Sequence, residues 1–382
     1  MTIFANLVFW GSLLALVYVY LGYPLLLSLI ASLRRSRTAE LGYTPAISVL
    51  IAACNEEAGI RQKLEQTVQL EYPADKLEIL VLSDGSQDRT DEIVNAFPDP
   101  RVRLVRIPQR MGKTNAQNEG VKQAKGEVLI FSDATTIYHS LALRYLAANY
   151  SDPRVGAVSG RYKYFDPNES SPTGMGTMAF WNYENNIKVS QSRISTLTGC
   201  CGCIYSVRKS AYTDLAPDVI SDLVQPLWAI QKGYRVVFED RALAYEETTE
   251  STSEEFSMRV RVITRGMRGL LSVPELLKPW KNPWTAFQLF SHKILRWLVP
   301  VLLLLVLCGN LALLHQPVFR SFLVLQLCFY ALALLQTIVP LHRQWKILGV
   351  PLYFCTLNAA ALMSTIELLR GKKYVVWQPV RK

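Results

Sequence analysis

Charged side chains are absent from four long stretches of the sequence. Residues 1–33, 297–319, 321–341 and 347–366 contain no Asp, Glu, Lys or Arg. Each stretch approaches or exceeds the about 20 apolar residues that cross the hydrocarbon core of a bilayer. Residues 34–280, in contrast, mix charged and apolar side chains. The sequence therefore predicts a soluble domain held between one N-terminal and about three C-terminal transmembrane helices.

Lysine and arginine are also absent before the first apolar run, which speaks against a cleaved signal peptide. Arg34, Arg35 and Arg37 follow the run instead. The positive-inside rule then puts the N-terminus outside and the soluble domain in the cytoplasm, as in an integral protein of the cell inner membrane. Simple counting of spans would leave the basic tail 370–382 outside, so we expect one C-terminal segment to be re-entrant or interfacial.

Histidine is scarce, with four residues, and none lies near the cluster of Cys200, Cys201 and Cys203. Zinc sites usually need two well-spaced ligand pairs, so we interpret these cysteines as reduced thiols in a tight loop. The net charge is +10, but no nucleic-acid motif is present and many basic residues flank the apolar spans. The expected partners are therefore anionic lipid and a polyanionic small molecule rather than nucleic acid.

The soluble region alternates short apolar runs with helical patterns. The runs rich in β-forming residues are 46–53, 77–83, 102–107 and 127–132, and the helical patterns cover 57–70 and 88–97. This alternation predicts an α/β fold with a mostly parallel sheet. Asp84 and Asp133 follow two of the runs, at the strand ends where parallel sheets gather ligand-binding groups.

Four motifs in a fixed order carry a resemblance to a known family. They are Ser48–Glu57, Ser83–Asp88, Gly112–Asn118 and Ser132–Thr135. In this order they resemble family 2 glycosyltransferases, most closely the membrane-embedded branch with cellulose, hyaluronan and poly-N-acetylglucosamine synthases. The resemblance covers residues 45–270. It implies a GT-A-like fold, a nucleotide-sugar donor expected to be a UDP-sugar, a Mg²⁺ or Mn²⁺ ion, and inverting transfer to a glycan or lipid-linked acceptor.

The resemblance assigns the donor to six residues: Asn55, Glu56, Glu57, Asp84, Lys113 and Asp133. Each also has a purely structural interpretation. The first three could cap a helix, Asp84 could serve the turn before Gly85, and Lys113 could be a solvated surface residue. Asp133 and Thr135 occupy the place of the family's Asp-x-Asp metal motif, but a hydroxyl replaces the second carboxylate, which makes Thr135 a weak candidate ligand.

Asp222 is the expected catalytic base, because it matches the acidic motif that follows the donor motifs in the family. An Asp that caps a helix is the alternative. The loop that contains Gly199 and Cys200 resembles the family's acceptor-side loop, although a plain turn has a similar sequence. Of the family's Gln-x-x-Arg-Trp motif, only Arg261 is present at the usual spacing. We assign it to the acceptor and diphosphate side.

A second Arg-Trp pair, Arg296 and Trp297, stands at the start of an apolar span. Anchoring at the membrane surface is the simpler interpretation there, so residues 274–297 are expected to be an interfacial segment. The sequence thus predicts an N-terminal span in 1–33, a catalytic domain in 45–270 and a membrane region in 297–369. Two other functions stay open: single transfer to a lipid acceptor, and a catalytically silent subunit for membrane assembly.

Overall fold

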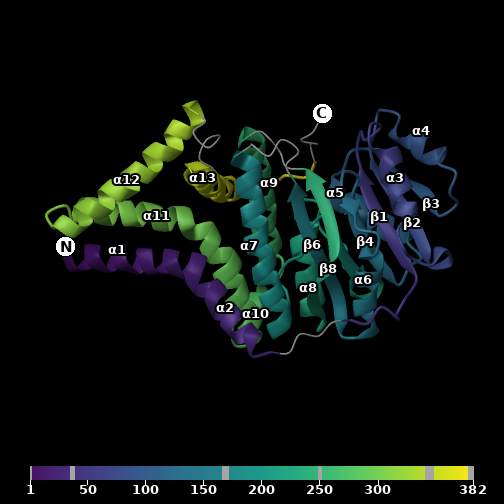
Figure 1. Cartoon of the computed structure of the whole chain (residues 1–382), viewed down its shortest axis with the longest axis horizontal. Helices are drawn as coiled ribbons and strands as arrows, with labels where there is room; N and C mark the ends of the chain where they lie inside the picture. The colour runs from purple at the N-terminus through teal and green to yellow at the C-terminus, as the bar shows by residue number, and fades with distance from the viewer. Residues whose placement is uncertain (1, 35–38, 166–171, 248–251, 340–347, 377–382) are drawn as a thin grey trace.

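The computed structural model describes residues 2–34, 39–165, 172–247, 252–339 and 348–376. A sheet with flanking helices occupies one end, and an arm of long helices extends from it (Figure 1). Arg35, Arg37 and residues 377–382, on which part of the topology prediction rests, lie outside the described residues.

The sheet has eight strands in the order β3-β2-β1-β4-β7-β6-β8-β5. The β1–β2, β2–β3, β1–β4 and β6–β8 pairs are parallel, and β4–β7, β6–β7 and β5–β8 are antiparallel. The predicted GT-A-like fold with a mostly parallel sheet is confirmed. The strands are β1 (Ile47–Ala53), β2 (Leu77–Asp84), β3 (Val102–Ile107), β4 (Val128–Asp133), β5 (Ile137–Tyr138), β6 (Val155–Phe165), β7 (Ile204–Arg208) and β8 (Arg235–Glu247).

Helices cover both faces of the parallel part of the sheet, which explains why its central strands are mainly apolar. All seven residues of β1 are buried. Residues of α3 (Ile60–Val68), α4 (Thr90–Asn95) and α6 (Ala142–Ala148) pack on one face, and residues of α5 (Lys113–Gln123) and α8 (Ser221–Gln231) pack on the other. Short 3₁₀ helices are η2 (Ala74–Lys76), η3 (Asn149–Ser151), η4 (Lys209–Ala211) and η5 (Pro274–Leu277).

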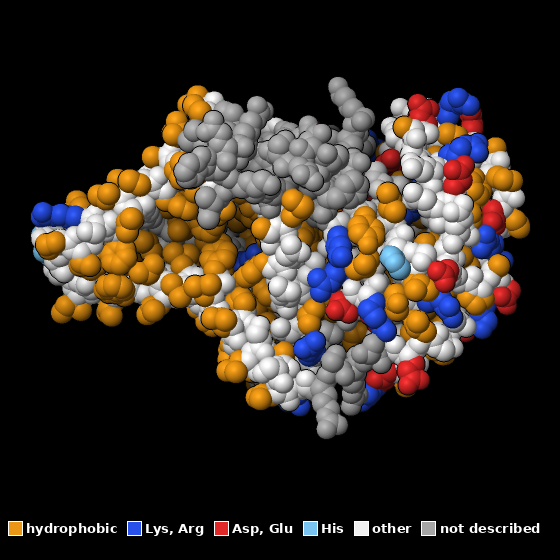
Figure 2. Space-filling model, viewed as in Figure 1, with side chains coloured by type: hydrophobic (Ala, Val, Ile, Leu, Met, Phe, Trp, Pro, Cys, Tyr) orange, Lys and Arg blue, Asp and Glu red, His pale blue; other side chains and the backbone are white. Residues whose placement is uncertain are grey.

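Four helical stretches are long and apolar enough to cross a membrane: Thr2–Ser32, Pro283–Ala312, Pro317–Ile338 and Gly349–Leu369. One N-terminal and three C-terminal stretches of this kind match the prediction, and the chain is an integral membrane protein. Hydrophobic side chains cover the arm, whereas charged ones gather over the sheet (Figure 2). The helices are α1 (Thr2–Val17), α2 (Tyr23–Ser32), α10 (Pro283–Leu289), α11 (Leu295–Ala312), α12 (Pro317–Ile338) and α13 (Gly349–Leu369).

Two long helices connect the arm to the sheet. They are α7 (Pro172–Ile194) and α9 (Thr252–Leu271), which lie between the two parts (Figure 1). Two π-helical segments, η1 (Tyr18–Gly22) and η6 (Phe290–Ile294), join α1 to α2 and α10 to α11. The interfacial position of residues 274–297 stays a prediction, and in the structure this segment runs directly into α11.

Candidate active site

A cavity of about 460 Å³ lies between the sheet and the arm. Its walls come from the ends of β1 and β4, from α7, α8 and α9, and from three of the apolar helical stretches. Among the residues predicted from sequence, eight line it: Asn55, Glu56, Asp133, Thr135, Gly199, Cys200, Asp222 and Arg261. Glu57, Asp84 and Lys113 are not among the lining residues.

Asp222 lies in the first turn of α8, where Ile220 is the N-cap residue. The interpretation of Asp222 as a capping residue is therefore wrong. Its Oδ1 atom is buried and has no hydrogen-bond partner among the described residues. Burial raises the pKa of this carboxyl, although nearby cations oppose the rise. A buried, unpartnered carboxylate is costly unless a ligand compensates it, so this atom is available to a substrate.

The glycine and cysteine loop packs directly against Asp222. The amide of Cys200 donates to the Asp222 carbonyl oxygen at 2.8 Å. At Gly202, an added Cβ atom would lie 2.7 Å from Asp222 Oδ2, so only glycine fits without displacing the carboxylate. Cys200, Cys201 and Cys203 are buried free thiols. The loop therefore positions the carboxylate.

Asp133 forms an ion pair with Lys113 from the start of α5. Burial would lower the pKa of Lys113, but the charge of Asp133 raises it above its usual value. Thr135 Oγ1 donates to Glu246 Oε1 at 3.0 Å, and Glu246 also lines the cavity. Glu246, from the end of β8, thus brings a carboxylate to the position where the motif has a hydroxyl. No local sequence pattern indicates this pairing, because 111 residues separate the two positions.

Lys63 holds the strand end that carries Asp133. Its ammonium group is buried on α3 and donates to Ser132 Oγ at 2.8 Å and to the Thr136 carbonyl oxygen. Burial lowers the pKa of Lys63 to about 8, although the charge of Asp133 opposes this change. These bonds tie residues on both sides of the Asp133 to Thr135 segment. Sequence patterns did not distinguish Lys63 from other polar residues of its helix.

The residues after β1 bind the loop after β2. Asn55 has a φ of 56°, and its Oδ1 atom accepts a hydrogen bond from the Gln87 amide at 2.9 Å. Glu57 Oε2 accepts one from the Arg89 amide at 3.1 Å. Helix α3 begins only at Ile60, with Gly59 as its N-cap residue. These residues therefore join the loops after β1 and β2, rather than capping α3 as one interpretation held.

Asp84 orders the glycine turn that precedes Lys113. Its two carboxylate oxygens accept hydrogen bonds from the amides of Met111 and Gly112, at 2.7 and 2.8 Å. Gly112 has a φ of 88°, which disfavours other residues. A Cβ atom there would also meet the carbonyl oxygen of Val375, near the C-terminus. Asp84 thereby places α5 and its first residue, Lys113.

Arg296 and Trp297 line the cavity together with Asp222. The interpretation of this pair as a membrane anchor alone is wrong. Arg296 forms a buried ion pair with Glu184 of α7, and His292 Nε2 lies 3.2 Å from the same carboxylate oxygen. Burial by itself would raise the pKa of Glu184, but the charge of Arg296 holds it well below its usual range. In the sequence, the Arg-Trp pair itself indicated a possible role in the site. Its position at the start of an apolar span suggested the membrane surface instead.

No group of three or more His, Cys, Asp or Glu side chains that could hold a metal ion occurs within the described parts of the chain. Asp133, Thr135 and Glu246 bring side-chain oxygens to the cavity wall at the end of β4. Carboxylate and hydroxyl oxygens suit Mg²⁺ and Mn²⁺, whose remaining positions are commonly filled by substrate phosphates and water. The residues present therefore fit a metal ion that arrives with a phosphorylated ligand.

The strand-end carboxylate, the loops after β1 and β2, and a separate buried carboxylate on α8 are carried by a GT-A-like fold. Residues 48–216 match the family described as glycosyl transferase family 2.

Two curated relatives are named poly-beta-1,6-N-acetyl-D-glucosamine synthase. The Staphylococcus epidermidis protein is 32% identical over 232 residues, which are 59% of this chain and 55% of that protein. The protein of Staphylococcus aureus strain COL is 29% identical over 247 residues, 63% of this chain and 59% of that protein. The match thus spans little more than half the length of these relatives.

A solved structure shares the architecture over nearly the whole chain. It is the mannosyltransferase PcManGT from Pyrobaculum calidifontis, in complex with GDP-Man and Mn²⁺. The TM-score is 0.71 at 21% sequence identity, and the alignment covers 95% of this chain and 99% of that one. At this identity the similarity establishes the common fold.

Proposed function

We propose that the protein is an inverting glycosyltransferase that moves a sugar from a nucleotide sugar, expected to be a UDP-sugar, onto a glycan acceptor at the membrane. The observation that carries this proposal is the cavity itself. It brings the strand-end carboxylate Asp133 and the unpartnered carboxylate of Asp222 to one space, beside helices that enter the bilayer. The names of the staphylococcal relatives support a polysaccharide of the cell envelope as product.

Asp222 acts as the general base in this proposal. An acceptor hydroxyl oxygen attacks the anomeric carbon while the bond from that carbon to the diphosphate oxygen breaks. The hydroxyl proton passes to Asp222, and the electron pair of the broken bond leaves with the nucleoside diphosphate. A single displacement of this kind inverts the anomeric carbon.

The donor occupies the half of the cavity near β1 and β4. Asn55, Glu56 and Asp133 line it and contact the nucleotide sugar directly, whereas Glu57 and Asp84 order the loops around it. Lys113 is held beside Asp133 and offers its charge to the diphosphate. Gly199, Cys200 and Arg261 form the acceptor and diphosphate side.

Asp133 and Glu246, with Thr135 as a weaker ligand, would hold a Mg²⁺ or Mn²⁺ ion that arrives with the donor. The ion would neutralise charge on the leaving diphosphate. Inhibition by EDTA, reversed by added Mn²⁺, is the expected behaviour of the purified enzyme. Full activity after complete removal of divalent ions would contradict this role.

The catalytic domain faces the cytoplasm in this proposal, because nucleotide sugars are made there and Arg34 follows an uncharged span.

The geometry of the site favours an enzyme over a catalytically silent assembly subunit, since a silent homologue has no need to keep a buried carboxylate unpartnered in an open cavity.

The test is the Asp222→Asn variant, which keeps the shape of the side chain and removes the base. Release of nucleoside diphosphate from a panel of nucleotide sugars should fall by about 10² or more, while nucleotide affinity changes little. Asp214→Asn is the matched control, because Asp214 is exposed and does not line the cavity. Turnover near that of the parent enzyme in Asp222→Asn would remove Asp222 from the mechanism.

A further inference from the structure

The 212–220 segment, which leads into α8, has no regular secondary structure. These residues form no helix or strand, and they end at the helix whose first turn carries Asp222. A segment without a hydrogen-bonded ladder of its own is held in place by its contacts with neighbouring elements. The position of the proposed base therefore depends on groups outside α8.

Helix α5 supplies one set of these contacts to the 212–220 segment. Asn118 Nδ2 donates to the Leu215 carbonyl oxygen at 2.8 Å, and Asn118 Oδ1 accepts from the Leu215 amide at 3.2 Å. One helical turn earlier, the Thr114 hydroxyl donates to the Val219 carbonyl oxygen at 2.9 Å. The segment is thus fastened to α5 at two points, and the second lies just before α8 begins.

Helix α5 is itself fixed on the sheet. A Cβ atom added at Gly120 would lie 2.4 Å from the Leu82 side chain, so the helix is in close contact with β2 there. Lys113, the first residue of α5, forms the ion pair with Asp133. Of the two partners, α5 is therefore the fixed one, and we expect the 212–220 segment to move when contacts between them are lost.

Arg265 of α9 completes the junction between α5 and the 212–220 segment. Its Nη2 atom donates to the carbonyl oxygens of Val219 and Pro217, at 2.6 and 3.2 Å, and to Thr114 Oγ1 at 2.7 Å. Arg265 is buried, and it does not line the cavity. One guanidinium group thus holds both elements, and it reaches a substrate only through them.

The Arg265 guanidinium is held by neutral groups. Within the described residues, its hydrogen bonds go to two carbonyl oxygens and one hydroxyl. A neutral donor would satisfy the same acceptors, so these bonds alone do not account for a buried charge, which is costly. Burial and the charge of Arg261 lower the pKa of Arg265 to about 10, and the charge of Asp222 opposes this change. The group stays positive at neutral pH and favours the ionised form of Asp222.

We propose that Arg265 is a positioning residue for the base. It fixes the 212–220 segment on α5 and so sets the distance between Asp222 and Lys113. The inference rests on the proposed function, in which Asp222 takes the proton of the attacking hydroxyl while Lys113 offers its charge to the leaving diphosphate. These two groups act at opposite ends of the reacting bonds, so their separation has to suit the attacking and the leaving oxygen at once.

The test is Arg265→Met, which removes the charge and the hydrogen bonds and keeps an unbranched side chain. Release of nucleoside diphosphate is measured on the full chain in nanodiscs, with the nucleotide sugar that is active in the panel. We expect kcat to fall by about 10- to 100-fold, the cost of a displacement of about 1 Å at a reacting group. Affinity for the nucleoside diphosphate should change by less than about twofold, because α5 and Lys113 stay in place.

The second arm repeats the substitution in the Asp222→Asn variant. With no base left to position, Arg265→Met should lower the remaining kcat by less than about twofold. A residue that only supports the fold would lower kcat by the same factor in both backgrounds, and that result would overturn the proposal. Parent-like turnover of Asp222→Asn alone would instead contradict the proposed function, so the two failures are distinguishable.

Arg61→Met is the matched control, because Arg61 is exposed on α3 and does not line the cavity. It should leave kcat unchanged. If Arg265→Met does not fold, Thr114→Val replaces it, since this variant keeps the shape of the side chain and removes the hydroxyl that joins α5 to Val219. Its kcat should also fall, and again not in the Asp222→Asn background. A folded variant at either position with the kcat of the parent enzyme would overturn the proposal.

Discussion

The ionisation of Asp222 depends on a balance between burial and nearby cations. Burial alone favours the neutral carboxyl, whereas a general base has to be ionised before it can accept a proton. The charges of Lys113 and Lys188 are the strongest that oppose burial. Two lysines outside α8 can therefore influence the pH at which the enzyme works.

This balance predicts the pH dependence of turnover. Because the base must be ionised and burial raises its pKa, kcat/KM should rise with pH, with its midpoint above the pKa of an exposed aspartate. Lys188→Gln removes one stabilising charge, so its midpoint should lie at higher pH than that of the parent enzyme. Lys122→Gln, at an exposed ion pair on α5, serves as control and should leave the profile unchanged. A midpoint that moves to lower pH in Lys188→Gln would refute this account.

Gly202 provides a second test at the residue scale. Gly202→Ala would bring a methyl group to 2.7 Å from Asp222 Oδ2, so the carboxylate has to move. We expect kcat to fall by about 10- to 100-fold, the cost of a displacement of about 1 Å in an active site. Gly59→Ala is the control, because φ is −116° there and no atom lies within 4 Å of the new Cβ. Equal activity of the two variants would show that the loop does not position Asp222.

Single residues also show what could be predicted from sequence. Asp133 and Asp222 were identified because each stands in a motif of local sequence, and both line the cavity. Glu246 and Lys63 were missed, since their importance comes from pairing across the fold with Thr135 and Ser132. Arg296 was misinterpreted for a related reason: the sequence places it at a membrane span, and only the fold brings that span to Asp222.

At the scale of elements, the two π-helical segments stand out. Each interrupts a candidate span. The stretch Thr2–Ser32 bends between α1 and α2 (Figure 1). They also bind each other, because Tyr18 OH and Ser291 Oγ are 2.8 Å apart. Such segments are frequent at functional sites, and Tyr20 of one and His292 of the other line the cavity. Strands β1 to β4 could be predicted from their apolar runs. The π-helical segments could not, because no comparable sequence pattern marks them.

The bond between the two segments should be measurable as stability. Tyr18→Phe removes it, and the free energy of unfolding should fall by about 1 kcal/mol, the usual contribution of one hydrogen bond. Thermal unfolding in nanodiscs provides the measurement. Tyr43→Phe is the matched control, since Tyr43 is exposed and lies outside the helices of the arm. If both variants unfold at the temperature of the parent protein, the contact does not stabilise the bends.

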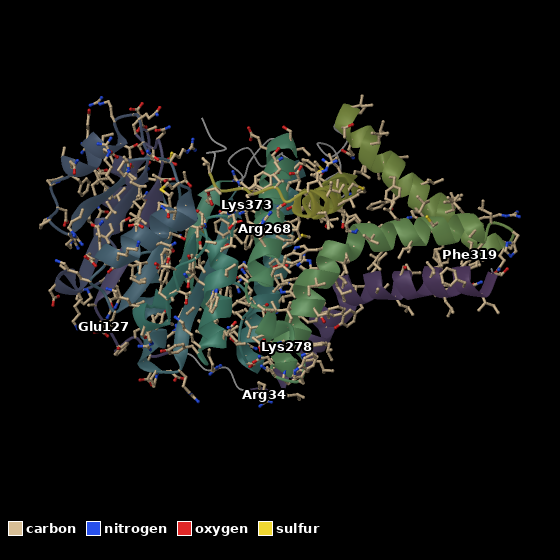
Figure 3. All side chains as sticks on the ribbon, turned by 180° about the vertical axis from the view of Figure 1, so that it is seen from behind. Arg34, Glu127, Arg268, Lys278, Phe319 and Lys373 are labelled. Carbon is tan, nitrogen blue, oxygen red and sulfur yellow. The ribbon has the colours of Figure 1, made fainter. Side chains whose placement is uncertain are left out.

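At the scale of the whole molecule, the two ends of the arm differ. The N-terminus and the turn between α11 and α12 lie together at the tip, where the Phe9 and Phe319 rings are 4.9 Å apart. Figure 3 shows Phe319 at that tip, whereas Arg268 and Lys373 lie beside each other near the sheet. Arg268 donates to the carbonyl oxygen of Lys372 at 2.9 Å. The described part of the basic tail therefore lies with the catalytic domain.

This arrangement bears on the topology of the C-terminal region. Four membrane spans would leave the basic tail 370–382 outside, against the positive-inside rule. Helix α13 packs along α9, with Ser364 Oγ donating to the Val260 carbonyl oxygen at 3.1 Å. If α11 and α12 cross the bilayer as a pair and α13 lies against the domain at its surface, the tail returns to the side of the sheet. We infer that α13 is the interfacial segment expected from the charge distribution.

Cysteine labelling can decide this topology. In a chain without the exposed Cys308 and Cys328, single cysteines are placed at Arg89 in the domain, Arg320 after the α11–α12 turn, and Lys373 in the tail. An impermeant maleimide should label only position 320 on intact cells, and positions 89 and 373 only after the inner face is opened. Labelling of 373 together with 320 would mean that α13 crosses the bilayer. Labelling of 89 on intact cells would reverse the orientation and exclude a cytoplasmic nucleotide sugar as donor.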